Sequence, residues 1–403
     1  MDGQDGNEPP AGGGGDRPVL GLVLTGGGAR AAYQVGVLRA LTELLPQRRN
    51  PFPVIVGTSA GAVAASVLGS QAHHWRAAVE GLVQVWGEFR VSQVFQVDAP
   101  HMLRSGLHWM LSLGSGGLLL SPPNSLLDNS PLRGLLAQRI DWAGVHTGIE
   151  RGQLKGLALC ATSYASGQSV AFFDAQPAVH DWSRSTRRGE RTRLSLEHLM
   201  ASVAIPMLFA PTRIGEQYYG DGAMRQLNPL SPAIHLGATR LLIVGVRSHS
   251  EVGLPASAEA PSPTPGQIFG FMLDTLITDQ IYADLEELTR LNQLARHASS
   301  DRAARTLRQV DALMLAPSAD PREIAARHIG EMPRGLRTLL RVTGARGPDS
   351  SQLASYLMFE AGYTRELIEL GYADAMAAGG QLRAFVYGEL PPAGSAPGLT
   401  WSV

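Results

Sequence analysis

The chain has 403 residues, of which 44% are hydrophobic and 17% charged, and its formal net charge is −1 at pH 7. This apolar content supports a folded core and excludes a wholly disordered chain. The near-neutral charge gives no overall attraction for nucleic acid, so we expect no nucleic-acid partner. The single cysteine, Cys160, excludes an internal disulfide and a cysteine-rich metal site, and its apolar neighbours predict a small buried side chain.

Residues 1–17 are rich in glycine, proline and acidic side chains, which predicts a disordered tail. They lack the basic stretch followed by an apolar run that marks a secretory signal. No later stretch holds the ~18 consecutive apolar residues that a membrane-spanning helix needs. We therefore expect a cytoplasmic protein whose membrane contact is confined to the periphery.

Two strand–helix units begin the folded part. Residues 19–24 form a continuous apolar run typical of a buried parallel strand, and apolar residues then recur at helical spacing as far as Leu44. Residues 53–56 repeat the strand pattern, and a helix of small residues is predicted over 59–69. Strands and helices in alternation predict an α/β fold with a mostly parallel central sheet.

The middle of the chain is less regular. Residues 92–150 are weakly patterned and rich in Gly, Ser and Pro, so we interpret them as an insertion, with a helix that Ser130 caps and Pro131 begins. The apolar runs at 154–162 and 169–174 predict a hairpin, and residues 241–246 predict another buried strand.

The last third begins with residues 251–266, a loop rich in Pro, Ala and Ser. An apolar stripe over 267–295 predicts one long helix, and residues 311–317 are interpreted as the last strand of the sheet. The sequence thus divides into the tail, a main domain of residues 18–317 and a helical extension of residues 318–403.

The sequence GTSAG, Gly57 to Gly61, places a G-x-S-x-G motif between a predicted strand and a predicted helix. In that position the motif is typical of a nucleophile elbow, where a tight turn exposes the serine hydroxyl and needs small neighbours. The N-terminus of the following helix would also stabilise negative charge at Ser59.

The glycines Gly26, Gly27 and Gly28 follow the first predicted strand, and with Ala31 they also match a dinucleotide-binding fingerprint. A dinucleotide site requires an acidic residue at the end of the second strand, where this chain has Gly-Thr-Ser. The glycine loop is therefore better interpreted as an oxyanion hole, whose backbone N–H groups face an ester oxygen attacked by Ser59.

Asp221 is the strongest candidate for a base that activates the serine, because the glycines on either side allow a sharp turn that presents the acid. A simple Asp-Gly hairpin turn is the alternative. No histidine has the expected setting on a loop after a late strand: His235 lies in a predicted helix, His249 precedes the loop, and His73 and His74 are expected on the surface of the helix after the elbow.

Three stretches resemble, in order, the motifs of bacterial patatin-like phospholipases: GGGARAAYQVGVLRAL, GTSAG and DGA. The segment from ASVAIP to SPAIHLGA around the acid is also similar. The resemblance covers roughly residues 18–317, and residues 318–403 resemble the C-terminal region of some longer members. It implies a patatin-like three-layer α/β/α sandwich with a helical C-terminal extension.

The resemblance further implies a lipid acyl hydrolase that uses a Ser–Asp dyad and an acyl-enzyme intermediate, with Ser59 as nucleophile and Asp221 as base. Gly26, Gly27 and Gly28 would form the oxyanion hole, with Arg30 closing the loop. The expected substrate is a phospholipid or another acyl lipid, and no metal or cofactor is required. The alternative is a catalytically weak lipid-binding or regulatory protein on the same scaffold, against which the intact motifs argue.

Three further features remain open between two interpretations. Arg30 opposes the helix dipole, so it either braces the loop or attracts an anionic headgroup. Residues 107–120 form either a lid that dips into lipid or an ordinary buried segment. Residues 184–193 carry five arginines, which form either a contact for anionic headgroups or a solvated loop.

Overall fold

The computed structural model describes residues 18–46, 50–96, 111, 114–115, 125–248, 262–297, 309–342, 351–388 and 399–402. Within them, one sheet has the strand order β11-β10-β9-β1-β2-β3-β4-β6-β5, and β8 pairs with β3 and β7 beside that path. The strands are β1 (Leu20–Leu24), β2 (Val54–Thr58), β3 (Gly156–Ser163), β4 (Ser169–Ala175), β5 (Trp182–Ser183), β6 (Arg187–Arg191), β7 (Thr212–Ile214), β8 (Gln217–Asp221), β9 (Arg240–Val244), β10 (Asp311–Leu315) and β11 (Leu399–Ser402).

The centre of the sheet is parallel, from β10 through β9, β1 and β2 to β3. These strands are short apolar runs buried on both faces, as parallel strands covered by helices must be. The predicted hairpin is confirmed, because β3 and β4 pair antiparallel.

One strand at the sheet's edge was not predicted. The strand at 311–315 is followed in the sheet by β11, which runs antiparallel to it and places Trp401 opposite Leu313. The prediction that residues 311–317 end the sheet is therefore wrong. A four-residue strand near the end of a largely helical segment is too short to show a pattern of its own.

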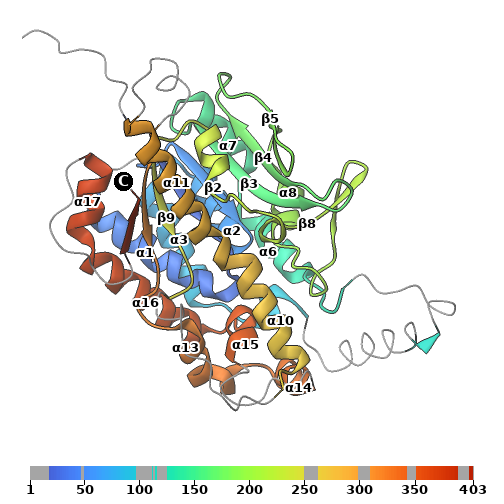
Figure 1. Cartoon of the computed structure of the whole chain (residues 1–403). Helices are drawn as coiled ribbons and strands as arrows, with labels where there is room; N and C mark the ends of the chain where they lie inside the picture. The colour runs from blue at the N-terminus through green and yellow to red at the C-terminus, as the bar shows by residue number, and fades with distance from the viewer. Residues whose placement is uncertain are drawn as a thin grey trace, which may run out of the picture.

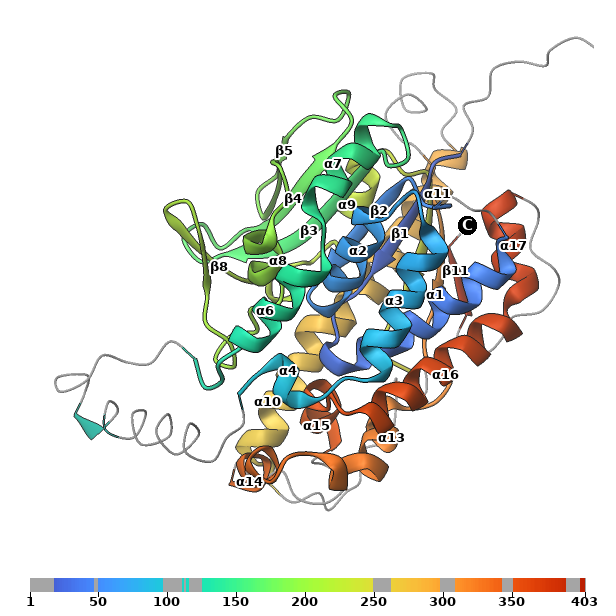
Figure 2. The ribbon, with the colours of Figure 1, turned by 180° about the vertical axis from the view of Figure 1, so that it is seen from behind.

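Helices cover both faces of the sheet. Figure 1 shows α11 in front of the strands, and Figure 2 shows α1, α2 and α3 on the opposite face. The helices are α1 (Ala32–Leu44), α2 (Ala60–Ser70), α3 (Trp75–Gly87), α4 (Val91–Val94), α6 (Ser130–Arg139), α7 (Trp142–Glu150), α8 (Leu196–Ser202), α9 (Ser231–His235), α10 (Pro265–Asp274), α11 (Gln280–His297), α13 (Pro321–His328), α14 (Arg334–Val342), α15 (Ser351–Leu357), α16 (Ala361–Ala377) and α17 (Gly379–Tyr387).

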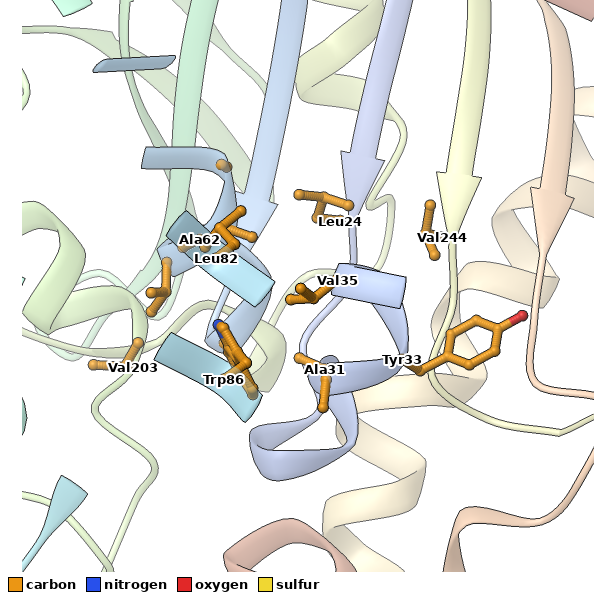
Figure 3. Packing of buried hydrophobic residues seen from close by; sticks show 14 of the residues in the cluster. Leu24, Ala31, Tyr33, Val35, Ala62, Leu82, Trp86, Val203 and Val244 are labelled. Atoms are coloured by element: carbon orange, nitrogen blue, oxygen red, sulfur yellow. The ribbon is translucent and has the colours of Figure 1, made fainter. Parts of the chain in front are cut away.

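The core accordingly has two parts, one on each face of the sheet. The larger contains side chains of α1, α2, α3 and the C-terminal helices, and the smaller contains side chains of α9 and α11. Figure 3 shows part of the larger one, where Val35 of α1 and Trp86 of α3 lie near Leu24 at the end of β1. The three-layer α/β fold with C-terminal helices is confirmed.

The C-terminal helix α16 packs directly along α1. A Cβ atom added to Gly371 would lie 2.1 Å from the carbonyl oxygen of Tyr33, so a glycine is needed at this approach. Tyr33 also donates a 3.1 Å hydrogen bond to Asp374. Burial of Leu367 and Ile368 in the same cluster as α1 makes the helices after residue 317 part of the larger core.

Three local predictions need correction. The helix expected over 267–295 is divided into α10 and α11 by a π-helical turn, Thr275–Asp279, and starts earlier because Thr264 caps it through the backbone N–H of Gln267. The cap of α6 is Asn129, and Ser130 is already helical. His73 and His74 lie in a turn after α2 ends at Ser70, although both are exposed as expected.

Candidate active site

Ser59 lies in the turn between β2 and α2 and has φ +54° and ψ −127°. This left-handed conformation is strained for a residue other than glycine, and it is the turn that the elbow motif predicts. The helix packs against β1 so closely that a Cβ atom added to Gly61 would lie 2.3 Å from the carbonyl oxygen of Leu24. Gly57, on the other side of Ser59, belongs to the end of β2.

The backbone of this turn is also held by α8. The N–H group of Ser59 donates a 3.0 Å hydrogen bond to Oγ of Ser202, whose hydroxyl donates to the carbonyl oxygen of Cys160 at 2.6 Å. The strained conformation is therefore fixed from both the helix and the neighbouring strand β3. Sequence reasoning missed Ser202, because an isolated serine in a small-residue segment carries no motif.

Asp221 ends β8 and lies beside Ser59. Strand β3 pairs with both β2 and β8, and this register brings the two side chains together. The hydroxyl of Ser59 donates a hydrogen bond to Oδ2 of Asp221 at 2.5 Å, and Oδ1 accepts one from the N–H of Ala223 at 2.9 Å. One carboxylate oxygen is thus positioned on the serine while the other is held by the backbone.

The environment of this pair favours a proton on the acid. Ser59 and Asp221 are 1% and 2% exposed. Burial raises the pKa of Asp221 to about 7, against the opposing effect of the hydrogen bonds from Ser59 and Ala223. Within the described part of the chain, neither side chain hydrogen-bonds a histidine.

The glycine loop passes next to the serine. A Cβ atom added to Gly26 would lie 3.1 Å from Cβ of Ser59. Gly28 has φ +55°, and a Cβ atom there would lie 2.3 Å from the carbonyl oxygen of Tyr356. In the described residues no protein acceptor receives a hydrogen bond from the N–H groups of Gly26, Gly27 or Gly28. These donors are therefore available to a ligand beside Ser59.

Arg30 lies behind this loop and is fully buried. Its guanidinium pairs with Asp274 at 3.0 Å, donates to Oγ of Ser355 at 2.8 Å, and lies 4.1 Å from the ring centre of Tyr356. The burial of Arg30 favours the interpretation that its side chain braces the glycine loop over the one in which it contacts a headgroup. These partners could not be predicted from the sequence, because they lie more than 240 residues from Arg30 along the chain. The one sequence feature that pointed to them was an acidic residue, Asp274, within the apolar stripe of α10.

An apolar hollow opens at Ser59. It is lined by Gly28, Ser59, Ala60, Val63, Trp86, Phe89, Val94, Leu132, Val203, Ile205, Phe209 and Phe359. These residues come from several segments of the chain, so no local pattern predicts the hollow. Apart from Ser59 they offer only apolar side chains, which suits a hydrocarbon chain beside the Ser59 hydroxyl.

The other features singled out in the sequence are not part of the Ser59–Asp221 pair. Cys160 is buried, as predicted, and burial raises the pKa of its thiol to about 12. Residues 107–120 fall outside the described residues except Leu111, Gly114 and Ser115. The middle of the arginine segment, residues 187–191, forms β6 and pairs with β4, whereas residues 184–186 and 192–193 on either side belong to no strand or helix. In the ranges that the structure describes, no helix is long and apolar enough to cross a membrane, and no group of three acidic, His or Cys side chains could hold a metal.

Curated protein sequences gave no match. Similar solved structures include human GIVD cytosolic phospholipase A2 in complex with methyl gamma-linolenyl fluorophosphonate. The two chains are 15% identical with a TM-score of 0.43, and the aligned region covers 92% of this chain and 59% of that chain. VipD from Legionella pneumophila shows 12% identity and a TM-score of 0.27, over 88% of this chain and 91% of that chain. The chain thus spans 59% of the length of the human enzyme.

The sequence profile of patatin-like phospholipases matches residues 22–234, which is more than half of the chain. The match contains the glycine loop, the elbow and Asp221, and it ends within α9. The chain therefore belongs to the patatin-like phospholipase family.

Proposed function

We propose that this chain is a lipid acyl hydrolase that cleaves a carboxylic ester of a phospholipid or another acyl lipid. The observation that carries the proposal is the 2.5 Å hydrogen bond between Oγ of Ser59 and Oδ2 of Asp221, next to a hollow lined by apolar side chains. A nucleophile in contact with a base is the basic requirement for covalent catalysis.

In the first half of the reaction, Oγ of Ser59 attacks the ester carbonyl carbon and its proton passes to Asp221. The bond between the carbonyl carbon and the alcohol oxygen then breaks, and the alcohol leaves with that proton. In the second half, a water molecule gives a proton to Asp221 and attacks the acyl-serine. The fatty acid leaves and Ser59 recovers the proton.

Negative charge on the tetrahedral oxygen is stabilised by the backbone N–H groups of Gly26, Gly27 and Gly28. Each such donor contributes on the order of 3–4 kcal/mol to catalysis in other serine enzymes. The first turn of α2 adds a favourable dipole at Ser59. Arg30 acts on this loop from behind, through Asp274 and the ring of Tyr356.

Peripheral contact with a lipid surface belongs to the same proposal. Ile268, Phe271 and Met272 are 48%, 66% and 50% exposed on α10, whose last residue is Asp274. Because Asp274 pairs with Arg30, this apolar surface is built on the helix that supports the glycine loop. Exposed apolar side chains of this size on one short helix suit insertion at a lipid–water boundary.

Hydrolysis of p-nitrophenyl esters of increasing chain length tests the proposal. We expect activity in the wild type and a loss of at least about 1000-fold in Ser59→Ala and in Asp221→Asn, because each removes one half of the dyad. A wild type inactive on these esters and on phospholipid vesicles would favour a lipid-binding role without catalysis. Full activity in Asp221→Asn would exclude Asp221 as the base.

A further inference from the structure

Three aromatic rings pack together in the lining of the hollow at Ser59. The ring centres of Trp86 and Phe89 lie 4.9 Å apart in an edge-to-face arrangement. The ring of Phe359 lies 5.7 Å from that of Phe89, again edge to face, and 6.4 Å from that of Trp86. We call these three side chains the aromatic wall, of which Figure 3 shows Trp86. Contacts of this geometry are favourable and hold the rings against one another.

The aromatic wall leaves little space beside Ser59. Its three side chains are buried, and the space that the hollow encloses is that of about three water molecules. An acyl chain that extends from an ester bound at Ser59 therefore fills this space with its first few carbon atoms. Carbon atoms further along the chain meet packed rings or stay outside the hollow.

Phe359 differs from the other two wall residues in where it comes from. Among the described residues that line the hollow, it alone lies beyond residue 234, where the family match ends. It belongs to the short connection between α15 and α16. Just before it, the ring of Tyr356 lies 4.1 Å from the guanidinium of Arg30, and just after it, Glu360 accepts a 3.3 Å hydrogen bond from the N–H of Val91 in α4. One segment of the C-terminal helices thus supports the glycine loop and also lines the hollow.

Building on the proposed hydrolysis at Ser59, we propose that Phe359 limits the length of the acyl chain that the hollow accepts. The preferred substrate is then an ester whose acyl chain is short enough to end at the aromatic wall, and longer chains gain nothing from their outer carbon atoms. Trp86 and Phe89 belong to the segment around α3, where burial in the core fixes them. Phe359 lies in a connection between helices, where a change of side chain alters the hollow with less effect on the helices themselves.

The proposal predicts how binding depends on chain length. Each methylene group that moves from water into an apolar site strengthens binding by about fourfold. A methylene group that finds no space adds nothing. A plot of affinity against chain length should therefore rise and then level off, and the length at which it levels off reports the position of the aromatic wall. A residue with only a structural role would change affinity at all lengths without moving this point.

Binding is measured on Ser59→Ala protein, so that the ester is not consumed. Isothermal titration uses methyl esters of straight-chain fatty acids, from butanoate to decanoate, below the concentration at which each aggregates. The test variant is Ser59→Ala/Phe359→Ala. The matched control is Ser59→Ala/Phe385→Ala, because Phe385 is also a buried phenylalanine of the C-terminal helices and does not line the hollow.

We expect the affinity of Ser59→Ala protein to level off within this series. Phe359→Ala should move that point to chains longer by at least about two carbon atoms, because loss of the ring leaves space for that much chain. Phe385→Ala should leave the point unchanged, even where it lowers stability. With Ser59 intact, kcat/KM for p-nitrophenyl esters should level off at the same lengths.

Affinity that levels off at the same length with and without the Phe359 ring overturns the proposal, as does an absence of binding or a steady rise through decanoate in Ser59→Ala protein. Circular dichroism and thermal melting check folding. If Phe359→Ala does not fold, Phe359→Leu gives the same comparison with a smaller loss of side chain. A shifted point in binding without hydrolysis by the wild type would contradict the proposed function alone, whereas hydrolysis with an unshifted point would contradict only the role of Phe359.

Discussion

In its proposed role as the base, Asp221 has to accept a proton from Ser59, although its side chain is enclosed by protein. A carboxyl group with its ordinary pKa is a weak base at neutral pH, and burial moves the pKa of Asp221 to about 7. The same burial makes the ionised form unfavourable in the folded state. Activity and stability should therefore depend on pH in opposite directions at this one residue.

We expect kcat/KM for a short soluble ester to rise with pH and to level off above about pH 7, as Asp221 loses its proton. A pH–rate profile from pH 5 to 9 measures it. A profile that is flat across this range would contradict a base with this pKa.

The stability of the folded protein should change with pH in the opposite direction. The folded pKa lies above the unfolded value of 3.8, so the folded state holds the proton more tightly and the free energy of unfolding falls as pH rises from about 4 to about 7. Asp221→Asn should remove this loss and be more stable than wild type at pH 8, by on the order of a few kcal/mol. Urea unfolding of both proteins at pH 5 and pH 8 provides the comparison.

At the scale of elements, the glycine loop depends on helices far along the chain. The brace joins η1 (Gly28–Ala31) to the end of α10 and to α15. Asp274 also accepts hydrogen bonds from Gln352 and Tyr356, both in α15. Since the family match ends at residue 234, these supports lie outside the segment that carries the motifs.

Asp274→Asn should therefore destabilise the protein and reduce kcat more than it raises KM. The variant leaves the buried guanidinium of Arg30 without its charge partner, for which about 3–5 kcal/mol is typical. Glu369→Gln is the matched control, since its pair with Arg39 also joins α1 to the C-terminal helices but is exposed. We expect at most about 1 kcal/mol there. Equal losses of stability in the two variants would argue against the brace.

Local sequence patterns predicted the elements whose structure is decided by residues close together in the chain. The elbow at Ser59 and the parallel strands followed from short apolar runs and small residues. The partners of Arg30, the hollow at Ser59 and strand β11 did not, because each depends on contacts between residues far apart in the chain. The π-helical turn before α11 was not predicted either. Its residues continue the helical pattern of the sequence, so the pattern does not distinguish a π-helical turn from an α-helical one.

At the scale of the whole molecule, the formal net charge of −1 gives little overall attraction for an anionic membrane, so contact with lipid would depend on exposed apolar side chains. The exposed side chains of α10 lie on the helix that ends at Asp274, whereas other exposed apolar residues such as Leu294 belong to α11, beyond the π-helical turn. If the proposed function holds, a lipid substrate has to leave the bilayer to reach Ser59. Insertion of α10 would shorten this path.

Phe271→Ser/Met272→Ser should consequently lower the hydrolysis of phospholipid vesicles about tenfold or more, because each buried apolar side chain contributes on the order of 1.5–3 kcal/mol to membrane binding. Hydrolysis of a short soluble ester should be unchanged, since neither side chain lines the hollow at Ser59. Leu294→Ser removes an equally exposed apolar side chain from α11 and should leave both activities intact. Parallel losses on vesicles and on the soluble ester would mean that α10 supports the glycine loop without contacting lipid.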